Sequence, residues 1–203
     1  MKKYLSKIFL LTFLSLVFLS ITAFSVSQAA YLDNNNFINE PLIDYDNLHF
    51  GNQVKITQIG TGNITESTQI GWSNQAEINQ NDKYNQSYNY QFGIENDSNI
   101  NQDGKNNFST LDQRGIKNSA SIVQIENDNW AGISQNGRNN KTSLRQNGEE
   151  NMSLVGQLGE NNQADIVMNG NNNETELLQL GSGINTEVVQ NGNDKYFNII
   201  IGE

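Results

Sequence analysis

The chain of 203 residues contains no cysteine, one proline and one histidine. The absence of cysteine excludes disulfide scaffolds, thiol catalysis and zinc sites built from Cys and His. Basic residues are also scarce, with 12 Lys and Arg against 22 Asp and Glu, and hydrophobic residues make up only 35%. In their place the chain has 35 Asn and 17 Gln. So polar a composition predicts disorder, unless a repeated architecture uses the amides structurally.

The N-terminal region 1–29 has the pattern of a secretory signal peptide. Three lysines among the first seven residues precede an apolar stretch over residues 8–24, and the small-x-small sequence Ser27-Gln28-Ala29 follows. The apolar stretch is shorter than the ~20 residues of a membrane span, so we expect cleavage after Ala29 rather than an anchor. Cleavage removes three lysines and no acid, which lowers the net charge from −10 to −13. A chain this acidic is expected to repel nucleic acid and anionic membrane surfaces.

The rest of the chain is organised by a short repeat. Glutamine recurs at every eleventh position from Gln58 to Gln190, with Met168 as the one interruption. Glycine follows each of these positions by two residues in all but two units, where Asp82 and Glu126 stand instead. Asparagine comes five residues after the glutamine, a small residue seven after it, and an aliphatic residue two before it in most units. The unit reads N-x-(A/S/T)-x-(I/L/V)-x-Q-x-G-x-x.

An 11-residue period is compatible with a helical coiled coil or with strands, and the spacing inside the unit separates the two. The constant residues lie at i, i+2, i+4, i+6 and i+8, which places them on one face of a strand and scatters them around a helix. One glycine per unit would cost a helix interior ~1 kcal/mol each time. The pattern therefore predicts a strand in each unit, closed by a short G-x-x-N turn in which Gly and Asn adopt positive φ.

Stacking of alternate units predicts an all-β, two-sheet parallel β-solenoid of about seven coils, each coil made of two units. Aliphatic and small residues of the two sheets would meet in a thin core, and the inward amides would form ladders in which each side chain bonds its copy one coil away. For these amides we expect a role in assembly, and they are Gln58, Gln69, Gln80, Gln91, Gln102, Gln113, Gln124, Gln135, Gln146, Gln157, Gln179, Gln190, Asn63, Asn85, Asn107, Asn129, Asn151 and Asn173.

The repeat resembles that of the curlin family. Units such as Asn118-x-Ala120-x-Ile122-x-Gln124 and Asn140-x-Thr142-x-Leu144-x-Gln146-x-Gly148-x-x-Asn151 carry the resemblance, which covers residues 52–201. The resemblance implies an extracellular functional amyloid of the bacterial cell surface, exported through an outer-membrane secretion machinery and serving in adhesion and biofilm matrix. It implies as partners other copies of the chain and a second curlin subunit.

Three regions follow from these patterns. Residues 1–29 are the expected signal peptide, residues 30–51 a flexible N-terminal segment that the resemblance assigns to secretion targeting, and residues 52–203 the curlin-repeat solenoid. No cap sequence is evident at either end of the repeat, so we expect the end strands to be open. The segment Tyr196–Ile201 keeps the alternation and is expected to pair with the first coil of another subunit.

The outward positions differ between the two predicted sheets. The sheet that starts at Gln53 has mostly polar outward residues, whereas half of those considered on the other sheet are apolar. We expect this second face to drive lateral bundling, with scattered surface apolar residues as the alternative. The aromatic residues expected to carry it are Tyr88, Tyr90, Phe92, Phe108 and Trp130.

The sequence lacks the groups of residues that an enzyme active site or a cofactor site requires. The paired acids Asp44/Asp46 and Glu149/Glu150 have no partner base, and His49 alone makes neither a catalytic triad nor a metal site. We therefore expect no enzyme activity, no cofactor, no metal and no small-molecule substrate.

Other roles for a solenoid remain possible at this point. A nucleating minor subunit of the curlin type fits the sequence as well as a major subunit does. A monomeric ice-binding solenoid would need a regular array of outward threonines, and a polysaccharide-active solenoid would need clustered acids beside a groove; neither feature is present.

Overall fold

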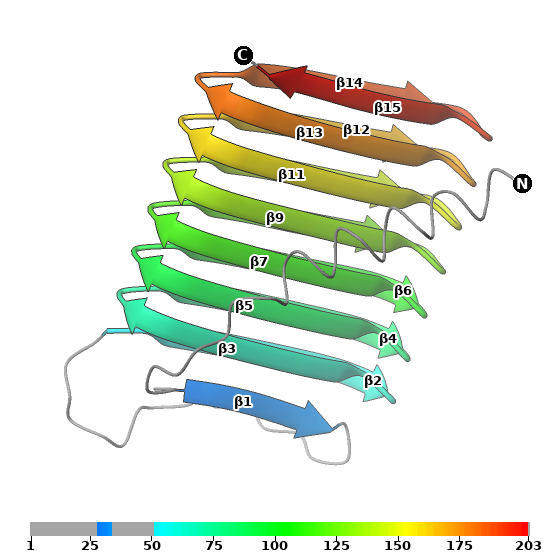
Figure 1. Ribbon diagram of the computed structural model, residues 1–203. Helices are drawn as coiled ribbons and strands as arrows, with labels where there is room; N and C mark the ends of the chain where they lie inside the picture. The colour runs from blue at the N-terminus through cyan, green and yellow to red at the C-terminus, as the bar shows by residue number, and fades with distance from the viewer. Residues whose placement is uncertain (1–27, 34–50, 203) are drawn as a thin grey trace, which may run out of the picture.

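The computed structural model describes residues 28–33 and 51–202 of the chain. Apart from Gln28–Asp33 and Gly51, the expected signal peptide and N-terminal segment lie outside these residues. The described residues form strands joined by short turns, and strands from one sheet lie behind those of the other along the whole stack (Figure 1). Within these ranges no helix is long and apolar enough to cross a membrane.

Two sheets build the molecule, and successive strands of the chain alternate between them. The order in the eight-stranded sheet is β1 (Gln28–Asp33), β3 (Ile64–Trp72), β5 (Gln86–Ile94), β7 (Phe108–Ile116), β9 (Trp130–Arg138), β11 (Met152–Glu160), β13 (Glu174–Ser182) and β15 (Tyr196–Gly202). The order in the seven-stranded sheet is β2 (Gln53–Thr61), β4 (Gln75–Lys83), β6 (Asp97–Lys105), β8 (Ser119–Ile125), β10 (Lys141–Asn147), β12 (Gln163–Asn169) and β14 (Asn185–Asn191).

Each strand from β2 to β13 pairs in parallel with the strand two further along the chain, and the register always joins equivalent positions of alternate repeat units. Ile100 thus lies beside Ile122, and Ile122 beside Leu144. The strands β2 to β15 make seven coils of two strands each. The predicted two-sheet parallel solenoid is confirmed.

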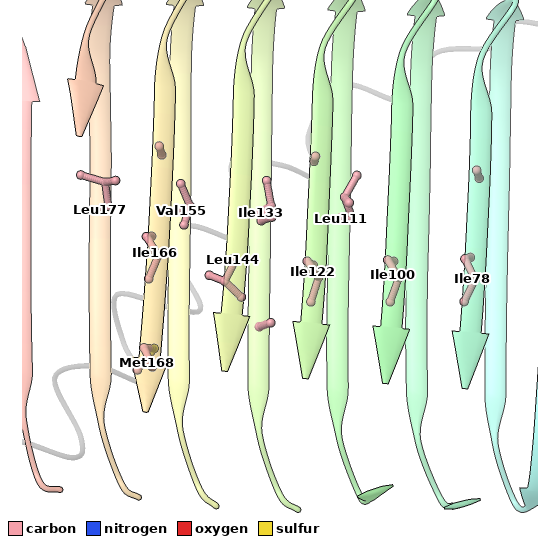
Figure 2. Close-up of a cluster of buried hydrophobic side chains, with 14 of the residues drawn as sticks. Ile78, Ile100, Leu111, Ile122, Ile133, Leu144, Val155, Ile166, Met168 and Leu177 are labelled. Atoms are coloured by element: carbon pink, nitrogen blue, oxygen red, sulfur yellow. The ribbon is translucent and has the colours of Figure 1, made fainter. Parts of the chain in front are cut away.

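The core lies between the two sheets. The strands bury alternate residues, as in the pattern of β6, where Ser98, Ile100 and Gln102 are buried. Aliphatic side chains from both sheets follow one another along the stack (Figure 2). The aliphatic column of the eight-stranded sheet contains one polar pair, in which Asn89 Nδ2 donates to the Ser67 hydroxyl at 3.1 Å. This bond offsets part of the cost of burying two polar side chains in an aliphatic column.

The turns follow the predicted glycine positions but differ from the prediction at asparagine. The repeated glycines have φ near +104 to +134°, and a Cβ on Gly115 would lie 2.0 Å from the carbonyl oxygen of Gly137 in the next coil. Asp82 and Glu126, which replace two of these glycines, also have positive φ. The repeated asparagine does not; the positive φ falls on the residue before it, for example Lys117 or Glu150. The expectation for Asn was wrong because its side chain faces inward and bonds the turn backbone.

The ends of the stack are less symmetric than expected. β1 pairs antiparallel with the outer edge of β3, from Gln28 opposite Gln69 to Asp33 opposite Ile64. The expectation that no strand covers the first coil is therefore wrong for the edge of β3. Among the described residues, the four end strands β1, β2, β14 and β15 have a strand neighbour on one side only.

Candidate functional site

Two ladders of glutamine side chains run through the interior, one in each sheet. In the seven-stranded sheet, Gln80 Nε2 donates to Gln102 Oε1 at 2.8 Å, and Gln102 donates to Gln124 at 2.8 Å. In the eight-stranded sheet, Gln91 donates to Gln113 at 2.8 Å, and Gln113 to Gln135 at 2.9 Å. The direction is the same at every step, so each amide accepts from one side and donates to the other. Chains of this kind satisfy amides that would be costly to bury singly.

Each glutamine also ties the two sheets together. The second N–H of Gln113 donates to the carbonyl oxygen of Asp97, which begins a strand of the opposite sheet, at 2.8 Å. Gln124 makes the same bond to Phe108 at 3.0 Å. The ladders therefore act as cross-links between the two sheets as well as along the stack.

Threonine hydroxyls replace the missing amides at both interruptions of the ladders. Met168 offers Gln190 no N–H, and Thr175 from the opposite sheet donates to Gln190 Oε1 at 3.0 Å instead. Ile201 offers Gln179 no acceptor, and Gln179 Nε2 donates to Thr186 Oγ1 at 2.9 Å. The small-residue column therefore has a second role that sequence reasoning missed. Threonine in that column does not by itself mark an interruption, because Thr65 and Thr142 make the same kind of bond to Gln80 and Gln157, where the ladder is intact.

The repeated asparagines hold the turns, in one column at each edge of the coil. Asn118 Nδ2 donates to the carbonyl oxygens of Arg114 and, in the next coil, Gly137, both at 3.1 Å. The backbone N–H of Asn118 in turn donates to Asn96 Oδ1 at 3.1 Å. The structure brings Asn63, Asn85, Asn107, Asn129, Asn151 and Asn173 into one such column, all of them buried.

The aromatic residues predicted for a lateral face lie together on the outer side of the eight-stranded sheet. The rings of Phe108 and Trp130 stack with centroids 5.8 Å apart, and the Tyr88 and Phe108 centroids are 5.7 Å apart. The guanidinium of Arg114 lies 5.6 Å from the ring centroid of Phe92. Tyr90, in the same strand as Tyr88, is half-buried, and this burial, together with the nearby Glu66, raises its pKa to about 12.

Carboxyl groups on this same outer face are partly withdrawn from water. Asp112 is buried although it faces outward, and burial raises its pKa against the opposing effect of its ion pair with Arg114, in which the N–O distance is 2.9 Å. Burial also raises the pKa of Glu174 and Glu176, and the charge of Glu176 adds to the shift at Glu174. Each of these groups is therefore easier to protonate in the folded chain than in water.

The remaining chemistry-bearing residues do not form a site. Residues 28–33 and 51–202 contain no group of three or more His, Asp or Glu side chains placed to hold a metal ion. Glu149 and Glu150 lie exposed in a turn, while His49 and the Asp44/Asp46 pair lie outside the described residues.

Comparison with known proteins agrees with the repeat geometry. No curated protein and no solved structure matches the chain. A family model described as the curlin associated repeat matches residues 137–167, which contain β10, β11 and most of β12. Within them lie Asn140, Gln146, Asn151 and Gln157, whose side chains belong to the ladders and turn columns. The match supports the assignment of the chain to the curlin family, which is a family of structural proteins.

Proposed function

We propose that this chain is a structural subunit of an extracellular curli-type amyloid fibre, formed by copies that stack coil on coil. The observation that carries the proposal is that the described coils leave open strand edges at β2, at one end of the stack, and at β14 and β15, at the other. The glutamine column of the seven-stranded sheet reaches two of these edges, with Gln58 in β2 and Gln190 in β14. Open strand edges template the addition of further strands. A fibre of such stacks would serve in cell adhesion and biofilm matrix.

The test is self-assembly of the purified chain that begins at Ala30. We expect thioflavin-positive fibres with a strand repeat of about 4.7 Å along the fibre axis in X-ray fibre diffraction. A chain that stays monomeric for days at micromolar concentration, while circular dichroism shows β structure, would overturn the proposal.

Export is part of the proposal. Residues 1–29 would direct secretion and be removed, and residues 30–51 would engage an outer-membrane secretion machinery. N-terminal sequencing of the protein recovered from the cell surface of a bacterium expressing the full chain should give Ala30 as the first residue. An intact N-terminus, or protein retained in the cell, would contradict this assignment.

The aromatic face is proposed to bundle fibres side by side. On the outer side of the eight-stranded sheet, the Phe108 and Trp130 rings stack and the Tyr88 ring lies tilted against Phe108. Association of fibres through this face would remove the exposed apolar surface of these rings from water. The triple substitution of Tyr88, Tyr90 and Phe92 by Ser should leave fibre growth intact and reduce bundle width in electron micrographs. Unchanged bundles would show that these residues are ordinary surface residues.

A second curlin subunit is a further proposed partner, because its coils would carry the same columns of amides. If the chain acts as the nucleating subunit, substoichiometric amounts should shorten the lag of a major curlin. If it forms the bulk of the fibre, its own growth should be rapid without added subunits.

A further inference from the structure

We propose that one copy docks onto the next through β14 and β2, in the same register that joins coils within the chain, with Glu187 of one copy paired with Lys55 of the next. The inference rests on the proposed stacking and specifies which sheet sets the junction. The docking partner is a second copy of this chain.

The inward residues of the seven-stranded sheet match across such a junction. Within the chain, Gln163 lies beside Asn185 at one end of this sheet, and Gln53 beside Gln75 at the other. Extending the register by one coil places Thr186, Val188 and Gln190 beside Val54, Ile56 and Gln58 of the next copy. The amide of Gln190 is buried and would donate to Gln58 Oε1, as Gln58 itself donates to Gln80 one coil later.

The outward charges also complement each other. Lys55 and Glu187 occupy the same outward column at opposite ends of the sheet, and both are exposed. Within the chain, Lys55 Nζ contacts Glu77 Oε1 at 2.8 Å across one coil step, and this bond lowers the pKa of Glu77. At the other end Glu187 lies beside Asp165, a like charge. A second copy would place Lys55 next to Glu187 and compensate that pair of acids.

The eight-stranded sheet matches poorly at the same junction. β15 has Phe197 in the column that holds Ser153 and Thr175, and Ile201 in the glutamine column. Lys195 takes the place of the turn asparagine before it. β15 would therefore bring no inward side-chain amide to β3 of the next copy, and its phenyl ring would enter a column of small residues. Specific register must come from the seven-stranded sheet.

The position of β1 adds a requirement. β1 occupies the outer edge of β3, which is where β15 of the docking copy would lie. Four of its six paired residues, 30–33, remain after the expected cleavage behind Ala29. Docking in full register therefore displaces β1, which makes the open edge of β2 the first available contact.

Charge reversal tests the junction, measured as the elongation rate from seeds of the same variant at about 0.05 M salt, where screening is weak. Glu187→Lys places two lysines at the junction, and we expect elongation to be about three- to tenfold slower. The double variant K55E/E77K keeps the ion pair within the chain but places a glutamate beside Glu187, so it should be similarly slow. The triple variant K55E/E77K/E187K restores both pairs and should recover the rate. Asp97→Lys makes the same change in charge in the middle of the sheet and serves as the control, with no change expected.

A cross-link gives a second readout that does not depend on rates. The chain has no cysteine, and neighbouring strands lie within the Cα separation that a disulfide spans. Oxidised fibres of the variant K55C/E187C should give covalent multimers on a denaturing gel, whereas E187C alone should give at most dimers. Fibres that form with the expected strand repeat but show neither the charge effect nor the multimers would overturn this junction and leave the proposed function standing. Failure of the wild-type chain to form fibres would overturn both.

Discussion

Thr175 Oγ1 donates to Gln190 Oε1 at 3.0 Å, in the position where Met168 interrupts the glutamine ladder of the seven-stranded sheet. A hydroxyl from one sheet thus supplies the donor that the other sheet lacks. Both groups are fully buried, so the bond has no water to replace it.

Removal of the Thr175 hydroxyl should destabilise the fold. Thr175→Val keeps the shape of the side chain and leaves Gln190 Oε1 without its donor, so we expect the free energy of unfolding to fall by about 1–3 kcal/mol. Denaturant unfolding of the monomer measures it. In the background of Met168→Gln, which restores the ladder donor, the same substitution should cost much less. Equal costs in both backgrounds would contradict the role assigned to Thr175.

Removal of a buried hydroxyl that has no hydrogen-bond partner, in the same column of small residues, should stabilise the fold. In the described part of the chain, the buried Ser109 Oγ has no hydrogen-bond partner, and Ala131 occupies the next position of the column. Ser109→Ala removes an unsatisfied polar group without creating a large cavity, so we expect stability to rise by up to about 1 kcal/mol. A measured loss of similar size would mean that the hydroxyl has a partner.

Substitution of a glutamine in the middle of a ladder should lower the free energy of unfolding more than substitution of a glutamine on the surface. Gln113→Met deprives Gln91 of its acceptor and Gln135 of its donor. We expect a loss of about 2–5 kcal/mol, because two buried groups lose partners. Gln163→Met, at an exposed outward position, is the control and should change stability by less than about 0.5 kcal/mol. Comparable losses at the two positions would refute a structural ladder.

Two glycines with positive φ should respond differently to alanine. At Gly115 a methyl group would lie 2.0 Å from a carbonyl oxygen of the next coil, whereas at Gly183 nothing lies within 4 Å. Gly183→Ala costs only the backbone strain of ~1 kcal/mol, and Gly115→Ala must also push two coils apart. We expect Gly115→Ala to cost at least about 2 kcal/mol more in the free energy of unfolding, as measured by denaturant titration.

Mild acid should stabilise the fold through its outer-face carboxyls. The folded-state pKa is raised at Asp112, Glu174, Glu176 and Asp97, chiefly by burial, so these groups bind protons more tightly when folded. Their contribution is full below the unfolded pKa near 4 and is lost as pH rises through the raised values.

Denaturant unfolding at several pH values between 4 and 7 measures this effect. The free energy of unfolding should increase as pH falls through this range. Asp112→Asn should flatten the dependence, since Asp112 is the most buried of the four. A stability that falls steadily from pH 7 to 4.5 would contradict this prediction.

The sequence alone determined the repeat, the strand in each unit and the parallel stacking of alternate units. A buried Gln or Asn amide that recurs in each unit can bond its own copies only if those copies lie in line along the stack. The columns of Gln and Asn therefore dictate the register of the strands. The repeat also predicted a glycine in most turns. At Gly115 a Cβ would lie 2.0 Å from a carbonyl oxygen of the next coil, whereas Asp82 and Glu126 occupy the same repeat position with a smaller positive φ.

Only the tertiary structure decided contacts between residues that the repeat does not align. The bonds of Thr175 to Gln190 and of Thr186 to Gln179 cross from one sheet to the other, and the period of the repeat contains no information on that pairing. The positive φ before each asparagine, the pairing of β1 with β3 and the burial of Asp112 likewise depend on how the coils approach one another. A strand pattern fixes which face a residue occupies, but the packing between sheets and at their ends sets what that residue touches.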